Sequence, residues 1–270
     1  RQLARLFPAR QSVADHADTL LRFAPGFLVA AGTTWMLFAA HLPMDELLRH
    51  ILARGWGYDY ASHYGNHFVD QHWSYWIGFD WAVVDMEHTP LDMDSLVRML
   101  QAVAGTAMLP ITRVPWNDTV MVKRVLDAGA QTVMFPFVQN ADEARKAVAA
   151  CRYAPQGVRG MAAMSRGSRF GTVPDYFKVA NDAISVVVQI ETPEALGQVD
   201  AIAGVDGVDS VFLGPGDLSG AMGHVGNPMH ADVVAAMAGA VERVHAAGKP
   251  VGSVAGTAEA VAIYRSIGID

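Results

Sequence analysis

Two carboxylates at the ends of two apolar runs are the residues of this sequence best suited to chemistry. Glu191 closes the run Val186-Val-Val-Gln-Ile-Glu191, and Asp217 follows Val211-Phe-Leu-Gly-Pro-Gly. Runs of this length and β-branched content are typical of strands buried on both faces. In parallel α/β proteins, ligands bind at the C-terminal ends of such strands. Two oxygen ligands there predict an open site for Mg²⁺ or Mn²⁺, with free positions left to water and substrate.

Two further side chains are expected at the same edge. His88 follows the apolar run Trp81-Ala-Val-Val84. An imidazole there can move protons near neutral pH while Asp85 holds its tautomer, although a satisfied loop histidine is an equally good interpretation. Arg113 ends the next predicted strand, where its guanidinium could stabilise an anion such as a carboxylate or enolate, or form an ion pair at the rim.

An amide and a glycine turn complete the candidate site. Gln189 lies two residues before Glu191, hence on the same strand face, and could hydrogen-bond a ligand or a metal-bound water. Gly214, Pro215 and Gly216 form a tight turn that opens a helix, and its backbone N–H groups could receive a substrate carboxylate. Turns need glycine in any case, so this motif alone is weak. Because the residues come from four predicted strands, their convergence at one edge predicts a single site.

The elements that must position these residues follow the rhythm of βαβ units. From Phe79 onward, apolar runs alternate with amphipathic stretches, which predicts a parallel sheet or barrel. The expected strands are Trp81–Asp85, Met108–Arg113, Thr132–Pro136, Ile184–Glu191, Ser210–Leu213 and Pro250–Val254. A first strand near Thr33–Phe38, with a helix at Asp45–Arg54, would make seven βα units. We expect the eighth strand to be missing, or, in a permuted arrangement, to be supplied by Gly26–Ala31.

Helix ends are marked by local signals. Asn140 followed by Glu143 is typical of a capping box, and Thr192 before a proline is typical of an N-cap. Gly129 and Gly248 are expected to end helices.

Composition excludes several classes of function. A chain of 270 residues that is 51% hydrophobic can bury its core as one domain. The net charge of −7 and the lack of a basic cluster argue against nucleic-acid partners. The single cysteine, Cys151, is expected to be a small core residue, which favours a reducing cytoplasm. Phe23–Met44 lacks charged residues, but its proline, glycines and threonines favour a strand over a membrane span.

The segment Gly57–Trp76 is crowded with aromatic and histidine residues. His63 and His67 could share a helical face for a metal, but no Glu or Cys completes a known ligand pattern. An aromatic loop or a partner-contact surface is the favoured interpretation.

The candidate site residues and their surroundings resemble the metal-dependent 2-oxo-acid aldolases of the HpcH/HpaI type. The resemblance covers residues 77–270, whereas residues 1–76 match poorly, so we expect an atypical N-terminal region followed by a barrel domain. Its motifs are Gly-Phe-Asp-Trp (78–81), Val-Asp-Met-Glu-His (84–88), Arg-Val-Pro-Trp-Asn-Asp (113–118), Asp-Ala-Gly-Ala-Gln-Thr (127–132), Pro-Gln-Gly-Val-Arg-Gly (155–160), Gln-Ile-Glu-Thr (189–192) and Gly-Pro-Gly-Asp-Leu-Ser (214–219).

The resemblance implies an α/β (β/α)8 TIM barrel whose last strand and C-terminal helix, which packs on a neighbouring subunit in a homo-oligomer, are absent from this sequence. It implies that Glu191 and Asp217 bind a divalent metal, Mg²⁺, Mn²⁺ or Co²⁺. Arg113 would steady the pyruvate enolate, and His88 paired with Asp85 would handle protons with a metal-bound water. Gln189 and the Gly214–Asp217 turn would line the pyruvate site.

The expected reaction is reversible aldol cleavage of a 4-hydroxy-2-oxo acid to pyruvate, or an analogue, and an aldehyde. A Schiff-base mechanism is disfavoured because Lys123 and Lys146 are predicted on helices, Lys178 near a helix, and Lys249 before a strand. Two alternatives remain open: a related metal-enolate lyase or decarboxylase, and a non-catalytic truncated relic.

Overall fold

The computed structural model describes residues 80–106 and 108–270, which all belong to one compact unit. Several predicted features lie outside the described residues: the strand Thr33–Phe38, the helix Asp45–Arg54, the alternative strand Gly26–Ala31, the apolar stretch Phe23–Met44 and the aromatic segment Gly57–Trp76.

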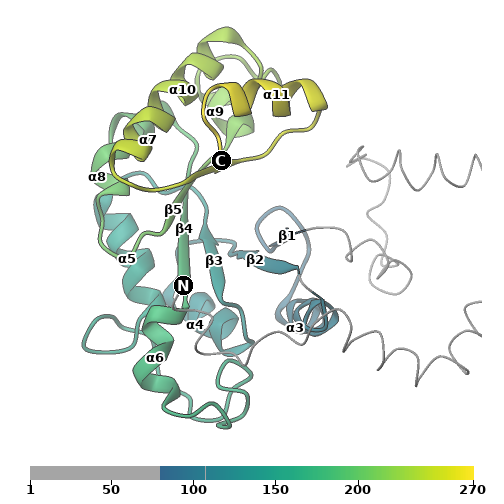
Figure 1. Ribbon diagram of the computed structural model, residues 1–270, viewed down its shortest axis with the longest axis vertical. Coiled ribbons are helices and arrows are strands. Elements are labelled where there is room, and N and C mark those ends of the chain that lie inside the picture. Colours follow the sequence, from purple (N-terminus) through teal and green to yellow (C-terminus); the bar gives the residue numbers. More distant parts are fainter. Residues whose placement is uncertain (1–79, 107) are drawn as a thin grey trace, which may run out of the picture. The chain divides into compact units, whose positions relative to one another are not determined.

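A parallel sheet forms the centre of the described part (Figure 1). Its strands are β1 (Trp81–Asp85), β2 (Leu109–Arg113), β3 (Thr132–Phe135), β4 (Ser185–Ile190), β5 (Ser210–Leu213) and β6 (Val251–Ser253). The six strands lie in the order β1-β2-β3-β4-β5-β6, so each pairs with the next along the chain. Parallel pairing between successive strands requires a crossover after each, and helices supply it.

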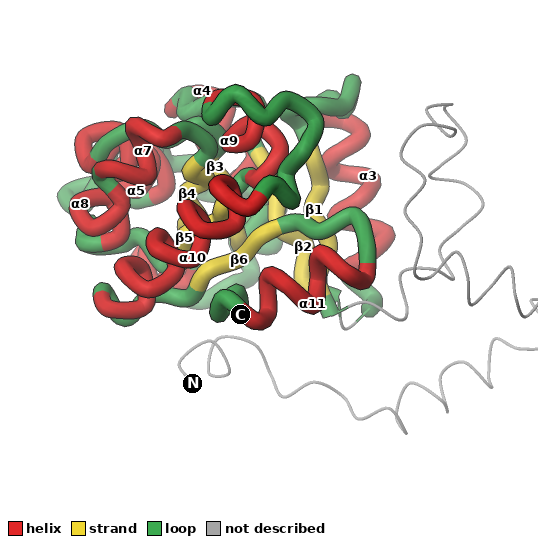
Figure 2. The backbone as a smooth tube through the Cα atoms, turned by 90° about the horizontal axis from the view of Figure 1, so that it is seen from above, coloured by secondary structure: helices red, strands yellow, loops and turns green. Residues whose placement is uncertain are grey.

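Helices connect the strands and surround them, as Figure 2 shows. They are α3 (Met93–Val103), α4 (Thr119–Asp127), α5 (Ala141–Cys151), α6 (Tyr176–Ala183), α7 (Pro193–Gly197), α8 (Val199–Ala203), α9 (Pro215–Ala221), α10 (Ala231–Ala246) and α11 (Ala258–Ser266). The architecture is a six-stranded parallel α/β half-barrel.

The two faces of the sheet bury different sets of side chains, because successive residues of a strand point to opposite sides. In β4, Val186 and Val188 belong to the large core shared with the helices. Val187 belongs instead to a small cluster with Met134 and Phe212 on the other face. The even-numbered face of β4 therefore packs on helices, and the odd-numbered face is the inner one.

Six of the seven predicted βα units are confirmed, with strand ends that differ by at most one residue. The predicted third strand loses Pro136, which has no N–H for the ladder, and the predicted fourth ends at Ile190 because Glu191 turns toward α7. The described residues agree in part with the predicted (β/α)8 barrel that lacks its last strand, because they form a half-barrel of six parallel strands.

The predicted helix ends are confirmed by their hydrogen bonds. Glu143 N donates to Asn140 Oδ1 at 2.9 Å, although the Glu143 carboxylate accepts from Gln139 N, one residue before the position that a capping box requires. Thr192 Oγ1 accepts from Ala195 N at 3.1 Å. Gly129 and Gly248 follow α4 and α10 with φ of 106° and 73°.

Cys151 lies at the end of α5 and is fully buried, as predicted. Burial raises the pKa of its thiol to about 12, so the side chain is a neutral core group. Within residues 80–106 and 108–270, no helix is both long and apolar enough to cross a membrane.

Candidate active site

Asp85 and Arg113 form a partly buried ion pair across the ends of β1 and β2. The parallel register places the two residues opposite each other. Arg113 Nε donates to Asp85 Oδ1 at 2.9 Å, and Nη2 donates to Oδ2 at 2.6 Å. Burial raises the pKa of the Asp85 carboxyl, but the hydrogen bonds and charge of Arg113 outweigh it, and the pKa lies below its ordinary value. The two-point contact fixes the plane of the guanidinium.

Glu87 is a second carboxylate beside the same guanidinium. Its Oε2 lies 3.1 Å from Arg113 Nη1 and 3.6 Å from Nε2 of His88. Burial, together with the charges of Asp85 and Asp217, raises the pKa of Glu87 despite the opposing effect of Arg113. The His88 side chain is 60% exposed, so its imidazole can meet a molecule that enters from solvent.

Gln189 links Arg113 to Glu191 on the neighbouring strand. Arg113 Nη1 donates to Gln189 Oε1 at 3.5 Å, and Gln189 Nε2 donates to Glu191 Oε1. The backbone of Gln189 is held in turn, since its carbonyl accepts from Val138 N at 3.0 Å. A continuous polar chain thus runs from Asp85 through Arg113 and Gln189 to Glu191.

Glu191 is a buried carboxylate in a negatively charged setting. Only 2% of the residue is exposed. Burial, followed by the negative charges of Asp217 and Glu87, raises its pKa to about 7, while Arg113 opposes the shift. The Arg113 guanidinium therefore interacts with three carboxylates, those of Asp85, Glu87 and Glu191, while the charge of Asp217 acts on Glu87 and Glu191.

The turn after β5 brings the backbone against Glu191. A Cβ on Gly214 would lie 2.5 Å from Glu191 Oε1, so no larger residue fits without displacing the carboxylate. Gly214 N donates to Ile190 O at 3.0 Å, and Pro215 is the first residue of α9. Asp217 lies exposed in the first turn of α9, so the turn pairs one buried and one accessible carboxylate.

The donor set fits a divalent cation. A buried carboxylate is stable in ionised form only when paired or metal-bound, and Glu191 forms no ion pair with a cationic side chain of the described residues; the Gln189 amide donates a hydrogen bond to it. The negative charges of Asp217 and Glu87 act on the same carboxylate. Hard oxygen ligands of this kind suit Mg²⁺ and similar cations.

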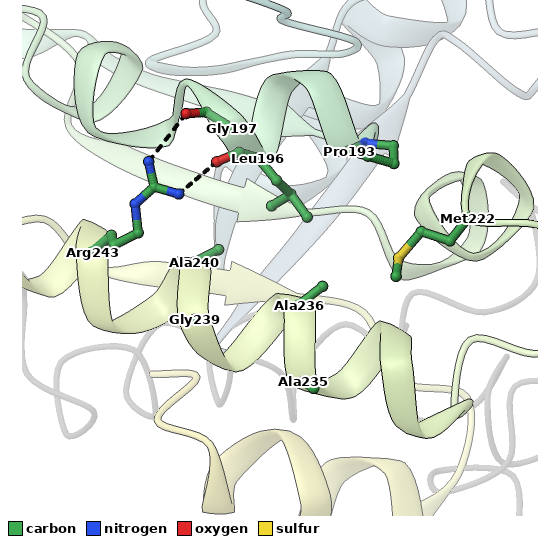
Figure 3. A pocket seen from close by; sticks show the side chains of 9 residues that line it. All are labelled: Pro193, Leu196, Gly197, Met222, Ala235, Ala236, Gly239, Ala240 and Arg243. Atoms are coloured by element: carbon green, nitrogen blue, oxygen red, sulfur yellow. Dashed lines mark hydrogen bonds between the residues drawn. The ribbon is translucent and has the colours of Figure 1, made fainter.

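A separate pocket lies on the helical side of the molecule, between α7 and α10 (Figure 3). Small side chains such as Ala236 and Ala240 line it, and Arg243 donates to the carbonyls of Leu196 and Gly197 at 2.9 and 3.2 Å. Its lining includes no carboxylate, so the pocket is not part of the candidate site.

The sequence model of the HpcH/HpaI aldolase/citrate lyase family matches residues 72–265. The chain belongs to the HpcH/HpaI family.

Relatives within the HpcH/HpaI family agree with this assignment. A Pseudomonas putida protein named 2-dehydro-3,6-dideoxy-6-sulfogluconate aldolase is 51% identical over 187 residues, which are 69% of this chain and 73% of the relative. A 4-hydroxy-2-oxo-heptane-1,7-dioate aldolase of Salmonella paratyphi A is 51% identical over 176 residues, 65% of this chain and 67% of the relative. This HpcH/HpaI protein is accordingly a carbon–carbon lyase.

A solved structure from the same family shares the fold. The HpcH/HpaI aldolase/citrate lyase family protein from Burkholderia cenocepacia J2315 matches with a TM-score of 0.69 and 40% identity, covering 71% of this chain and 77% of that one.

The structure brings most of the site residues predicted from the sequence close together, but one predicted contact is not formed. Asp85, Arg113, Gln189 and Glu191 form the polar chain, and Gly214 touches its end. The expected pairing of Asp85 with the His88 imidazole is not what the structure shows. The strand register places Asp85 beside Arg113, and His88, three residues past the strand, lies beside Glu87 instead.

Glu87 is a further residue of the candidate site, and it is not predicted from the sequence. It lies in the bend that follows β1, and its signal in the sequence is a carboxylate just past the C-terminal end of a strand, where ligands bind in parallel α/β proteins. Against the effect of burial, the negative charges of Asp85 and Glu87 both raise the pKa of the Arg113 guanidinium.

Proposed function

We propose that the chain catalyses metal-dependent, reversible aldol cleavage of a 4-hydroxy-2-oxo acid to pyruvate, or a close analogue, and an aldehyde. The observation that carries the proposal is the polar chain from Asp85 to Glu191, with the charge of Asp217 beside it. Two aldolase-named relatives at 51% identity support the same reaction, and one is named for a 4-hydroxy-2-oxo diacid.

In this proposal Glu191 and Asp217 hold the divalent metal. Oxygen ligands accept Mg²⁺, Mn²⁺ and Co²⁺ alike, so any of the three fits the donor set. When bound, the cation supplies Lewis-acid polarisation of the 2-oxo group. Gln189 and the turn Gly214–Asp217, which includes Pro215 and Gly216, would line the pyruvate part of the substrate and keep its carboxylate oriented.

The protein side chains would handle charge and protons. His88 takes the proton of the C4 hydroxyl, the C3–C4 bond breaks, and the aldehyde leaves. The electron pair of that bond passes to C3 and is delocalised onto the 2-oxo oxygen, where Arg113 opposes the negative charge. Asp85 is the positioning residue, because it holds the guanidinium at two points. The proton that His88 took from the C4 hydroxyl then passes to C3, directly or through water, which gives pyruvate and returns His88 to its starting state.

The position of the lysines supports the metal route over an imine. All four lysines of the chain fall within the described residues. Lys123, Lys146 and Lys178 are on α4, α5 and α6, and Lys249 lies just before β6, at the N-terminal end of that strand. An amine must reach the substrate carbonyl to form an imine, and the substrate site proposed here is at the opposite, C-terminal edge.

The proposal extends to the whole molecule. The half-barrel would be part of a (β/α)8 barrel, with residues 77–270 as the barrel domain and residues 1–76 as an atypical N-terminal region that includes a possible first barrel strand and helix. The working form would be a homo-oligomer, and a reducing cytoplasm suits its single cysteine. The alternatives are a related metal-enolate lyase or decarboxylase and a non-catalytic relic.

The first test is pyruvate release from a 4-hydroxy-2-oxo acid by the purified chain, with chelator and with Mn²⁺ added back. We expect release that chelator abolishes and Mn²⁺ restores. His88→Ala should lower the rate roughly 100-fold or more with Mn²⁺ affinity unchanged, since a general base contributes about that much. His245→Ala is the matched control, because His245 lies on α10 and contacts Asp270 instead of any residue of the candidate site.

Three outcomes would count against this assignment. Full activity of His88→Ala would remove His88 from the proton transfer. Release that survives chelation would exclude the metal. Metal-dependent exchange of the pyruvate methyl protons with solvent deuterium, without aldehyde release from any substrate, would favour the lyase or decarboxylase alternative.

A further inference from the structure

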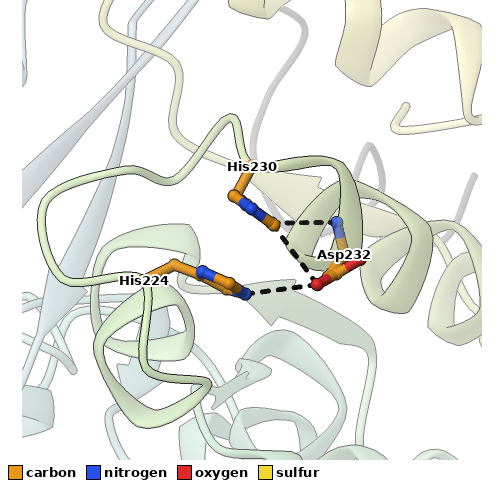
Figure 4. A group of neighbouring side chains, drawn as sticks. All are labelled: His224, His230 and Asp232. Carbon is orange, nitrogen blue, oxygen red and sulfur yellow. Dashed lines mark hydrogen bonds and ion pairs between the residues drawn. The ribbon is translucent and has the colours of Figure 1, made fainter.

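We propose a second metal site, formed by His224, His230 and Asp232, that takes Zn²⁺ or a similar transition-metal ion. The three residues lie in the loop after α9 and in the first turn of α10 (Figure 4). None of them belongs to the catalytic residues proposed above, and the inference does not rest on the proposed reaction.

The spacing of the donor atoms matches a tetrahedral ion. His224 Nε2 lies 3.3 Å from Asp232 Oδ2, and His230 Nδ1 lies 3.6 Å from the same oxygen. Bonds of about 2.0–2.1 Å at tetrahedral angles place neighbouring ligand atoms roughly 3.4 Å apart. One ligand atom from each residue lies within 4.8 Å of the others, so the set can close on one ion once the two imidazole rings turn toward Asp232.

The backbone holds the three residues in place. His224 N donates to Ser219 O at 2.7 Å, Asn227 N to His224 O at 2.9 Å, and His230 N to Asn227 O at 3.1 Å. The segment therefore presents its ligands from a hydrogen-bonded loop, which lowers the entropy lost on binding. The two imidazoles are partly buried, with 26% and 35% of their side chains exposed, while the Asp232 side chain is 67% exposed. The open side leaves room for water as a fourth ligand.

Binding requires the two rings to turn. They stack with centroids 3.5 Å apart and planes 12° from parallel, so their lone pairs run side by side. Convergence on one ion means rotation of both rings toward Asp232. His230 Nδ1 also accepts from Asp232 N at 3.2 Å, and the ion would replace that contact.

The ligand chemistry separates this site from the catalytic one. Two imidazoles and one carboxylate favour Zn²⁺, Cu²⁺ or Ni²⁺, whereas oxygen ligands alone suit Mg²⁺ and Mn²⁺. An ion here would tie the loop that follows α9, the helix that carries Asp217, to the start of α10.

The test is calorimetric titration of the full chain with Zn²⁺ while excess Mg²⁺ occupies the oxygen-ligand site. We expect a Zn²⁺ site that His224→Gln weakens at least tenfold, because this variant removes a ligand without touching the cap of α10. His230→Gln and Asp232→Asn should weaken it as well. His245→Gln is the control. It alters the contact of another α10 histidine with an aspartate, Asp270, and should leave Zn²⁺ affinity unchanged.

Equal Zn²⁺ affinity in the wild type and His224→Gln would overturn the proposal, as would the absence of Zn²⁺ binding under these conditions. The remaining histidines are common to all variants, so their background cancels in the comparison. Repeating the titration with Glu191→Gln should retain the site, which separates it from Zn²⁺ that displaces Mg²⁺ from the catalytic carboxylates. The titration does not need aldolase activity. The second metal site can therefore be disproved while the proposed function stands, and the proposed function can be disproved while the site stands.

Discussion

At the scale of single residues, the site is decided by an imbalance of charge. Arg113 forms ion pairs with Asp85 and Glu87. Its positive charge lowers the pKa of Glu191 by less than burial and the neighbouring carboxylates raise it. Glu191 is buried, and its pKa of about 7 reflects that burial first and the nearby carboxylates second. A proton and a divalent cation are therefore alternative ways to neutralise the same group.

This competition predicts pH-dependent metal binding. Below about pH 7 the Glu191 carboxyl carries a proton that the metal must displace, so the apparent Mn²⁺ affinity should fall about tenfold per pH unit and level off above pH 7. Titration calorimetry or Mn²⁺ electron paramagnetic resonance at a series of pH values measures this. Glu191→Gln should bind Mn²⁺ weakly at every pH, and a flat profile in the wild type would contradict the assignment.

The raised pKa of Glu191 also makes the stability of the metal-free chain depend on pH. The folded-state pKa of Glu191 lies above its ordinary value of 4.5, so the folded chain binds the extra proton between these values. The contribution of this group to stability is fully present below about pH 4.5 and is lost as the pH rises through about 7. Glu191→Gln should therefore raise the free energy of unfolding of the metal-free chain at pH 8 relative to the wild type, and have no such effect at pH 4.

At the scale of elements, the junction between β5 and α9 carries the site. Gly214 follows β5 and lies directly against Glu191, and α9 begins at the next residue, Pro215, and carries Asp217. Both proposed metal ligands are thus placed by one short turn and by the end of the neighbouring strand β4.

Replacement of Gly214 by alanine should damage metal binding. The added Cβ would lie 2.5 Å from Glu191 Oε1 and 2.8 Å from Cγ, so the carboxylate must move. We expect at least tenfold weaker Mn²⁺ binding, with a loss of stability of about 1–3 kcal/mol from overpacking. Gly216→Ala is the matched control, because no atom lies within 4 Å of its Cβ position. Wild-type Mn²⁺ affinity in Gly214→Ala would show that this contact does not position the ligand.

At the scale of the described molecule, a buried ion pair holds a long connection in place. Residues 152–175 join α5 to α6, and Arg159 within them donates to Asp127 Oδ1, at the end of α4, at 2.9 Å. The Arg159 side chain is fully buried and lies 4.4 Å from the ring of Tyr153. Its Nε and Nη1 have no hydrogen-bond partner within the described structure, so Asp127 is its principal compensation.

Removal of Asp127 should therefore be costly. Asp127→Ala leaves a buried guanidinium without its carboxylate, and we expect a loss of about 3 kcal/mol in the free energy of unfolding, measured by urea denaturation. The double variant with Arg159→Met should recover part of that loss. Asp142→Ala breaks an exposed ion pair with Arg145 and should leave stability nearly unchanged. Equal effects of Asp127→Ala and Asp142→Ala would show that the buried pair is not what holds the connection.

Local patterns in the sequence determined the elements and their order. The apolar runs predicted all six described strands, and Asn140, Thr192, Gly129 and Gly248 marked helix ends correctly. These signals are readable because hydrophobic periodicity, caps and left-handed glycines act within a few residues. They also placed the candidate acids at one edge, since parallel strands share the direction of their C-terminal ends.

Only the tertiary structure decided which of those residues touch. Asp85 meets Arg113 28 positions away, and Arg113 meets Gln189 76 positions away, through a register that no local pattern specifies. For that reason the predicted pairing of Asp85 with the His88 imidazole is wrong, and the sequence does not single out Glu87. The need for glycine at 214 likewise depends on a carboxylate from the adjacent strand. The sequence determines which chemical groups are present and on which elements they lie. Their partners and pKa values depend on strand pairing and burial, which bring groups from distant positions together.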